Sequence, residues 1–232
     1  MSAKCGQLHA LLNGLKRHSY PFNENGIPPN GIYIQFERGE VGHGGDRIVR
    51  IGTHTGAKSF LKDRLNEHWF AKNEQSGEYK GQYRSIFRDK IGDAIINKSR
   101  QEGSGFWTKE DLILWADPWR GGPRKWEKFQ MIERIEQYRK TCKLISDYVY
   151  ENISFALIEM ETLEQRKYFE KRLISTVSNC TECRPSKDWL GNFSTKLKVC
   201  QSGLWQEEQL WKDDLTDADM DFLTRAATGK LR

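Results

Sequence analysis

The sequence contains no long apolar run. Its longest apolar stretches, such as Phe155 to Ile158, are far shorter than the roughly 20 residues that cross a bilayer. Residues 1–16 hold no continuous apolar segment and no small-residue cleavage site, so they do not resemble a signal peptide. We therefore expect a protein that neither spans a membrane nor is exported.

Cysteine is scarce, with 5 residues in 232. In a chain without an export signal, such cysteines are expected to be reduced thiols, which favours a cytoplasmic location. Cys180, Cys183 and Cys200 offer three of the four ligands of a structural zinc site, but every histidine lies far upstream. The spacing therefore favours unbound thiols over zinc.

The chain also has no large excess of one charge. Its 37 basic and 32 acidic residues give a net charge of +5, which permits an acidic partner such as nucleic acid without requiring one. Hydrophobic residues make up 37% of the chain and 8 residues are Trp, which argues against extended disorder. No repeat, low-complexity tract or linker appears, so residues 1–232 are predicted to form a single elaborated domain.

Two strands are indicated early in the chain. Gly31 to Glu37 alternates apolar and polar residues with the period of a half-buried strand, and Arg47 to Gly52 is a second strand. A glycine-rich turn from Gly39 to Asp46 is expected to join the two as a hairpin with a longer loop. Ile153 to Met160 is a third predicted strand.

Helical spacing of apolar residues predicts most of the remaining elements. Thr162 is expected to cap the helix that follows it, and Thr216 with Asp219 is typical of a capping box for a final helix. The predicted helices cover residues 4–17, from just after 56 to about 70, 85–99, 108–115, 124–150 and 162–177, with a turn at 119–123.

Several of these segments resemble a known family. Gly31-Ile32-Tyr33 and Arg50-Ile51-Gly52 look like the paired strands that name the GIY-YIG nuclease family, with Arg50 where the second motif usually has Tyr. Residues 61–68 resemble the family's first helix, and residues 168–174 its later, metal-binding helix. The segments IVRIGTH, SIFR, DWLG and SGLW look like a bacterial subgroup, so the resemblance spans roughly residues 28–205.

The resemblance implies an α/β (α+β) fold, a small three-stranded antiparallel sheet flanked by helices. The core would comprise about residues 28–68 and 153–205. Residues of about 69–152 would then form a helical insertion, followed at the end of the chain by a helical C-terminal extension.

The resemblance also implies catalytic roles. Tyr33 would activate water, and Arg64 would stabilise the phosphoryl oxygens because a guanidinium stays charged and donates two hydrogen bonds at once. His68 and His54 would assist by hydrogen bonding or proton transfer. We hypothesise that Arg50 replaces the family's second Tyr by favouring the phenolate form of Tyr33.

Glu170 is the expected metal ligand, for Mg²⁺ or Mn²⁺, since Mg²⁺ commonly takes one or two protein carboxylates. The family's last polar residue is an Asn beyond this helix, and Asn192 is slightly preferred over Asn179.

Each residue also has a purely structural interpretation. Tyr33 could be a strand aromatic, Arg50 a solvated cation and Arg64 a member of a surface pair. Glu170 could pair with Arg166 or Arg172. For His54 the structural interpretation is about as strong as the functional one.

We therefore expect a metal-dependent endonuclease that hydrolyses phosphodiester bonds in DNA. One alternative is the same chemistry on RNA or repair intermediates. The other is a catalytically inactive nucleic-acid-binding module of the same fold, which the change at Arg50 keeps open. The sequence does not indicate an oligomeric state.

Overall fold

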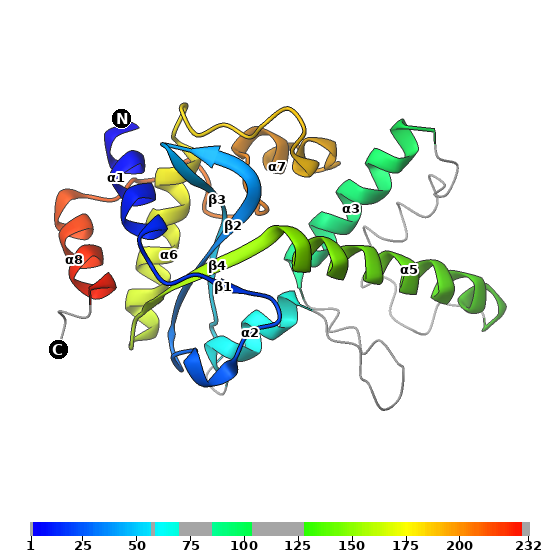
Figure 1. Cartoon of the computed structure of the whole chain (residues 1–232), viewed down its shortest axis with the longest axis horizontal. Coiled ribbons are helices and arrows are strands. Elements are labelled where there is room, and N and C mark those ends of the chain that lie inside the picture. The colour runs from blue at the N-terminus through cyan, green and yellow to red at the C-terminus, as the bar shows by residue number, and fades with distance from the viewer. Residues whose placement is uncertain (1, 57–58, 70–84, 104–127, 229–232) are drawn as a thin grey trace.

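The computed structural model describes residues 2–56, 59–69, 85–103 and 128–228, with only the backbone of 128–139. One antiparallel sheet with strand order β1-β4-β2-β3 forms its centre, and helices cover both faces (Figure 1). The elements are α1 (Ser2–Asn13), β1 (His18–Ser19), η1 (Glu24–Gly26), β2 (Gly31–Gly42), β3 (Gly45–Thr53), α2 (Leu61–His68), α3 (Ile86–Gln101), α5 (Lys128–Asn152), β4 (Ile153–Glu159), α6 (Leu163–Ser178), η3 (Leu190–Phe193), α7 (Leu197–Ser202) and α8 (Asp217–Ala227).

The α/β class and the flanking helices are confirmed, but the sheet has four strands where three were expected. The added strand is β1, in which His18 and Ser19 pair with Phe155 and Ser154 of β4. Two residues cannot show an alternating pattern, so this edge strand carries no sequence signal.

The β2–β3 hairpin is longer and tighter than expected. β2 continues to Gly42, and the turn consists of His43 and Gly44, with φ of 52° and 79°. Two positive φ angles match the type I′ turn that best fits the twist of a hairpin. Gly39, read from the sequence as part of a turn, instead has φ of 83° where the strand register shifts in a bulge.

The sheet separates two hydrophobic cores, because successive side chains of a strand point to opposite faces. Ile32, Ile34 and Phe36 of β2 face a first core shared with α1, α6 and α8. Tyr33 and the β3 residue Val49 face a second core built with α2, α3 and α5. Figure 1 shows the two groups of helices on opposite sides of the strands.

Two helices begin where the sequence predicted a capping side chain. The Thr162 side chain accepts from Gln165 N before α6, and Thr216 and Asp219 form the predicted capping box of α8. Where no cap was identified, the bounds shifted: α1 ends at Asn13, and α2 begins only at Leu61. The predicted helix at 108–115 and turn at 119–123 lie outside the described residues.

A buried carboxylate holds the second core together. Oε2 of Glu37 accepts hydrogen bonds from the indole nitrogens of Trp189 (3.0 Å) and Trp205 (2.8 Å), and Oε1 accepts from the Tyr148 hydroxyl. Burial raises the pKa of Glu37, and the three donors partly oppose this. The DWLG and SGLW segments therefore contribute buried Trp anchors on the sheet.

None of the helices in the described ranges is both long enough and apolar enough for a membrane span.

Candidate active site

A chain of hydrogen bonds links β2, α2 and α3 on the second-core face of the sheet. The Tyr33 hydroxyl lies 2.8 Å from Nε2 of His68, and Nδ1 of His68 lies 2.8 Å from Oγ of Ser85. Ser85 is the N-cap of α3, where its side chain accepts from the backbone of Arg88. The position of the His68 ring is therefore fixed from both sides.

His68 is neutral in the folded protein near pH 7. Burial lowers the pKa of His68 well below its usual value, and the charges of Arg50, Arg64 and Arg88 lower the pKa further. In the tautomer whose Nδ1–H donates to Ser85, the Nε2 lone pair faces the Tyr33 hydroxyl. This arrangement accepts a hydrogen bond from the phenol and holds the hydroxyl in place, while the lowered pKa makes the imidazole a weak base.

Arg64 is the cation at the Tyr33 hydroxyl. Burial lowers the pKa of Arg64, but its interactions with nearby Tyr33 and with the carboxylate of Glu67 outweigh burial and raise the pKa. Its Nη1 donates to Oε2 of Glu67 at 2.5 Å, and 22% of the side chain is exposed. Arg64 therefore joins a buried phenol to the solvent-facing side of α2.

Arg50 lies beside this group but binds elsewhere. It pairs across the sheet with Gln35, and its Nη1 donates to the carbonyl of Trp205 at 2.5 Å. The guanidinium lies 5.2 Å from the ring centre of Phe87. Within the described ranges no hydrogen bond joins Arg50 to Tyr33, and the buried Nε of Arg50 has no hydrogen-bond partner.

Glu170 reaches the site from the other face of the sheet. Its Oε1 accepts from the backbone nitrogen of Thr53, the last residue of β3, at 3.1 Å. Burial raises the pKa of Glu170, while that hydrogen bond and the charges of Arg50 and Arg64 lower it. The charges of both arginines therefore act on a carboxylate that is anchored at the end of β3.

The ion pairs considered for Glu170 from the sequence are not formed. Arg166 donates to the carbonyl of Glu161 at 2.7 Å, and Arg172 donates to the carbonyl of Asp214 at 2.6 Å. Among the described residues, Oε2 of Glu170 accepts no hydrogen bond. One available carboxylate oxygen suits Mg²⁺ or Mn²⁺, because such ions bind few protein carboxylates and keep several waters.

His54 lies next to the Glu170 anchor. Its Nε2 lies 3.0 Å from Oδ1 of Asn30, and burial together with the charge of Arg166 lowers the pKa of His54. The sequence interpretation missed Asn30 and Ser85 as partners of the two histidines. The only available signals were that Asn30 directly precedes the Gly31 motif and that Ser85 begins the SIFR segment.

Neither candidate asparagine beyond α6 is brought to this site. Asn192 is exposed, and its Nδ2 donates to the carbonyls of Ser186 (2.9 Å) and Lys187 (3.0 Å). Asn179 ends α6, and its Nδ2 donates to Asp214 at 2.7 Å. Among the described residues, no hydrogen bond joins either asparagine to the tyrosine, arginines or carboxylate above.

Comparison with known proteins gives one family. A family model described as GIY-YIG domain matches residues 5–230, a range that includes every site residue discussed above. No curated protein and no solved structure matches the chain.

Proposed function

The chain belongs to the GIY-YIG domain family, which implies a nuclease, and we propose that it is a metal-dependent endonuclease that hydrolyses phosphodiester bonds in DNA. The observation that carries this proposal is the hydrogen bond between the Tyr33 hydroxyl and His68, with Arg64 close enough to interact with the same phenol. A phenol placed between a neutral imidazole and a guanidinium can lose its proton and then serve as a base.

The proposed reaction begins with proton transfer. Tyr33 would release its phenolic proton to solvent, with the nearby charge of Arg64 favouring the phenolate, and the phenolate oxygen would then take a proton from the attacking water. The water oxygen then forms a bond to phosphorus while the bond from phosphorus to the leaving sugar oxygen breaks, and solvent protonates the leaving oxygen. Ser85 would keep the His68 ring in the orientation that holds the Tyr33 oxygen.

Charge on the phosphate is neutralised by residues on both sides of β3. Arg64 would donate to the phosphoryl oxygens with the part of its guanidinium that faces solvent. Glu170 would hold the divalent cation, which stabilises negative charge on the phosphoryl group. The hydrogen bond from Thr53 orients the Glu170 carboxylate and leaves Oε2 for the metal.

The remaining predicted site residues take supporting roles in this proposal. Arg50 supplies positive charge to the Glu170 and His68 surroundings while holding the Trp205 segment on the sheet. His54 would assist beside Glu170, and Asn192 would act only by approaching from its surface turn. Residues 69–152 would be the insertion that influences substrate choice.

The test is cleavage of supercoiled plasmid, single-stranded DNA and structured RNA with Mg²⁺, Mn²⁺ or EDTA. We expect the wild-type protein to cut DNA only with metal, and Glu170→Ala to be reduced to background. The matched control is Glu164→Ala, which removes an exposed carboxylate from the first turn of the same helix. This variant should cut like wild type.

Cleavage of RNA alone would keep the chemistry and reassign the substrate. A wild-type protein that binds nucleic acid but cuts neither DNA nor RNA would refute the enzyme and leave a binding module of the same fold.

A further inference from the structure

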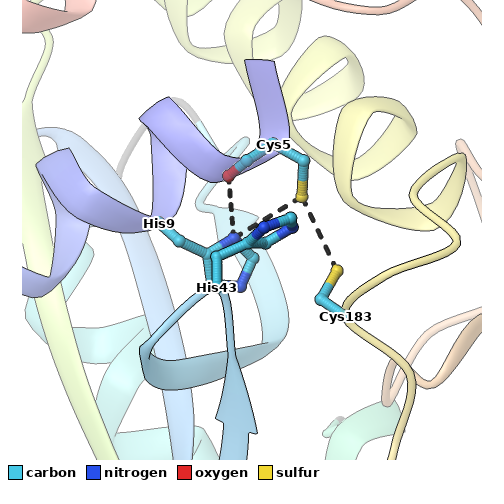
Figure 2. Close-up of side chains that lie close together, drawn as sticks. All are labelled: Cys5, His9, His43 and Cys183. Carbon is cyan, nitrogen blue, oxygen red and sulfur yellow. Dashed lines mark hydrogen bonds between the residues drawn. The ribbon is translucent and has the colours of Figure 1, made fainter. Parts of the chain in front are cut away.

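A cluster of cysteines and histidines lies outside the candidate active site, in the first core. Cys5, His9, His43 and Cys183 lie close together, and each has a ligand-type atom within 4.8 Å of those of the other three (Figure 2). Cys5 and His9 come from α1, His43 from the β2–β3 turn and Cys183 from the segment after α6. Cys180, near the end of α6, joins the cluster through its Sγ, 3.2 Å from Nε2 of His43.

The spacing of the sulfur atoms fits a metal ion. Sγ of Cys5 and Sγ of Cys183 lie 3.6 Å apart, and all five cysteines are free thiols. Tetrahedral zinc with bonds of about 2.3 Å to sulfur places two sulfur ligands about 3.8 Å apart. Thiolate and imidazole ligands select zinc, whereas Mg²⁺ prefers oxygen. This cluster is therefore chemically distinct from the single carboxylate of Glu170.

We propose that Cys5, His43, Cys180 and Cys183 bind a structural Zn²⁺ ion. Cys180 and Cys183 form a C-x-x-C pair, and the backbone nitrogen of Glu182 donates to Sγ of Cys180 at 3.4 Å. This backbone N–H is a hydrogen bond that a metal-bound sulfur can accept, of the kind that orients metal ligands from outside.

His43 is held for this role. Its backbone φ of 52° is the one that the type I′ turn requires, so the hairpin fixes the position of His43. Nδ1 of His43 lies 3.8 Å from the Glu182 carboxylate, while Nε2 faces Cys180. A carboxylate on the far nitrogen is the usual outer partner of a zinc-bound histidine.

His9 is placed behind the ion in this assignment. Its Nδ1 lies 2.9 Å from the Cys5 carbonyl, and its Nε2 accepts from the backbone of Ile48 at 3.3 Å, so both ring nitrogens have partners. Neighbouring Gly42 makes room for the cluster, because a Cβ at that position would lie 3.0 Å from Cβ of Cys183 and 3.3 Å from Nε2 of His9.

Such an ion would fasten three segments that are distant in sequence: α1, the tip of the hairpin and the segment after α6. Since these segments pack the first core against β2 and β3, the ion would contribute to stability and would not contact Tyr33 and His68, which lie on the opposite face. Cys200, which the sequence grouped with Cys180 and Cys183, lies elsewhere, 3.3 Å from the Ser194 carbonyl.

The test begins with the wild-type chain, purified under reducing conditions without added metal and analysed for metal by mass spectrometry. We expect about one zinc per chain, and after removal of zinc with a chelator we expect added Co²⁺ to give thiolate-to-cobalt absorption. Chelation should also lower the midpoint of thermal unfolding, and Zn²⁺ but not Mg²⁺ should restore it. Absence of zinc together with absence of the cobalt bands would overturn the proposal.

Variants then assign the ligands. Cys183→Ser and Cys180→Ser should lose zinc or bind it at least about tenfold more weakly, while Cys200→Ser, the matched control, should keep it. His9→Gln should also keep zinc. Loss of zinc in His9→Gln with retention in Cys180→Ser would show that the fourth ligand is His9 and overturn the assignment of Cys180. Glu170→Ala should keep zinc even if it cannot cut, which separates this site from the nuclease site.

Discussion

The hydroxyl oxygen of Tyr33 lies directly over the backbone of Gly52, its partner across the β2–β3 pair. A Cβ built on Gly52 would stand only 2.2 Å from that oxygen. The glycine of the second sequence motif is thus needed by the tyrosine of the first. The two motifs fit together as one unit, in which the bare backbone of Gly52 leaves the space that the phenol occupies.

Gly52→Ala should therefore disable the site while leaving the fold. The added methyl group must push the Tyr33 hydroxyl away from His68, and a displacement of about 1 Å at a reacting group can cost on the order of 100-fold in rate. We expect a loss of that size in the cleavage rate, measured on plasmid DNA. Gly26→Ala is the control, because nothing lies within 4 Å of its added Cβ. Wild-type cleavage by Gly52→Ala would contradict the proposed role of Tyr33.

Tyr33→Phe should separate the catalytic role of the Tyr33 hydroxyl from the packing of its ring. The ring still fills the second core, but the base is gone, so kcat should fall by about 100- to 10,000-fold. The matched control is Tyr20→Phe, which removes another buried hydroxyl, one that accepts from Gln35 at 2.9 Å. Each variant leaves a buried polar group without its partner, at about 1–3 kcal/mol in the free energy of unfolding. Only Tyr33→Phe should lose cleavage. Equal losses of cleavage in the two variants would contradict the role of Tyr33 as the base.

Arg64→Lys should show whether Arg64 acts by donating two parallel hydrogen bonds from its guanidinium. Lysine keeps the charge but cannot donate two parallel hydrogen bonds to a phosphate, so we expect kcat/KM to fall about 10- to 100-fold. The substitution also alters the ion pair with Glu67, and Glu67→Gln controls for that change. Glu67→Gln should keep cleavage and change the free energy of unfolding by only about 0.2–0.5 kcal/mol. Loss of cleavage in Glu67→Gln together with normal cleavage in Arg64→Lys would show that cleavage depends on the ion pair and not on the two donors of Arg64.

His68 predicts a pH dependence of stability. The pKa of His68 in the folded protein lies well below 6.5, the value expected in the unfolded chain. At pH values between these two pKa values, the unfolded chain binds a proton that the folded chain does not. The free energy of unfolding should therefore decrease as pH falls below about 6.5, by up to about 1.4 kcal/mol per pH unit from this residue, with no contribution above that pH.

Urea unfolding of wild type and His68→Gln between pH 5 and 8 measures this effect. Below pH 6.5, the free energy of unfolding of the variant should depend less steeply on pH. The difference in slope should correspond to the uptake of about one proton on unfolding. The remaining slope should reflect the other histidines with lowered pKa, His9 and His54 among them. Parallel slopes in the two proteins would mean that His68 is protonated in the folded state.

The elements that the sequence predicted are those with strong local patterns. Alternation in Gly31 to Glu37 predicted the first half of β2, and helical spacing with a Thr162 cap predicted α6. The two-residue β1 was missed because it is too short for a pattern, and the hairpin turn was misplaced because Gly39 occupies a bulge instead of a turn.

In the candidate site, too, local motifs were predicted from the sequence and contacts between distant residues were not. Tyr33 and His68 were selected from motifs, and the structure joins them with a hydrogen bond. The contact of Arg50 with the Trp205 carbonyl spans 155 positions, and no local spacing predicts it. Likewise, the contact of Cys5 with Cys183 spans 178 positions, so the sequence grouped Cys183 with its nearer neighbours.

Arg88 ties α3 to the C-terminal half of α5, since its Nη2 donates to the carbonyl of Cys142 at 3.0 Å and to Oγ of Ser146 at 2.9 Å. The same guanidinium donates from Nη1 to the carbonyl of His68 at 3.4 Å, so one side chain braces the end of α2 as well as α5. A substitution at Ser146, which lies 78 positions along the chain from His68, is therefore expected to loosen the imidazole that contacts Tyr33.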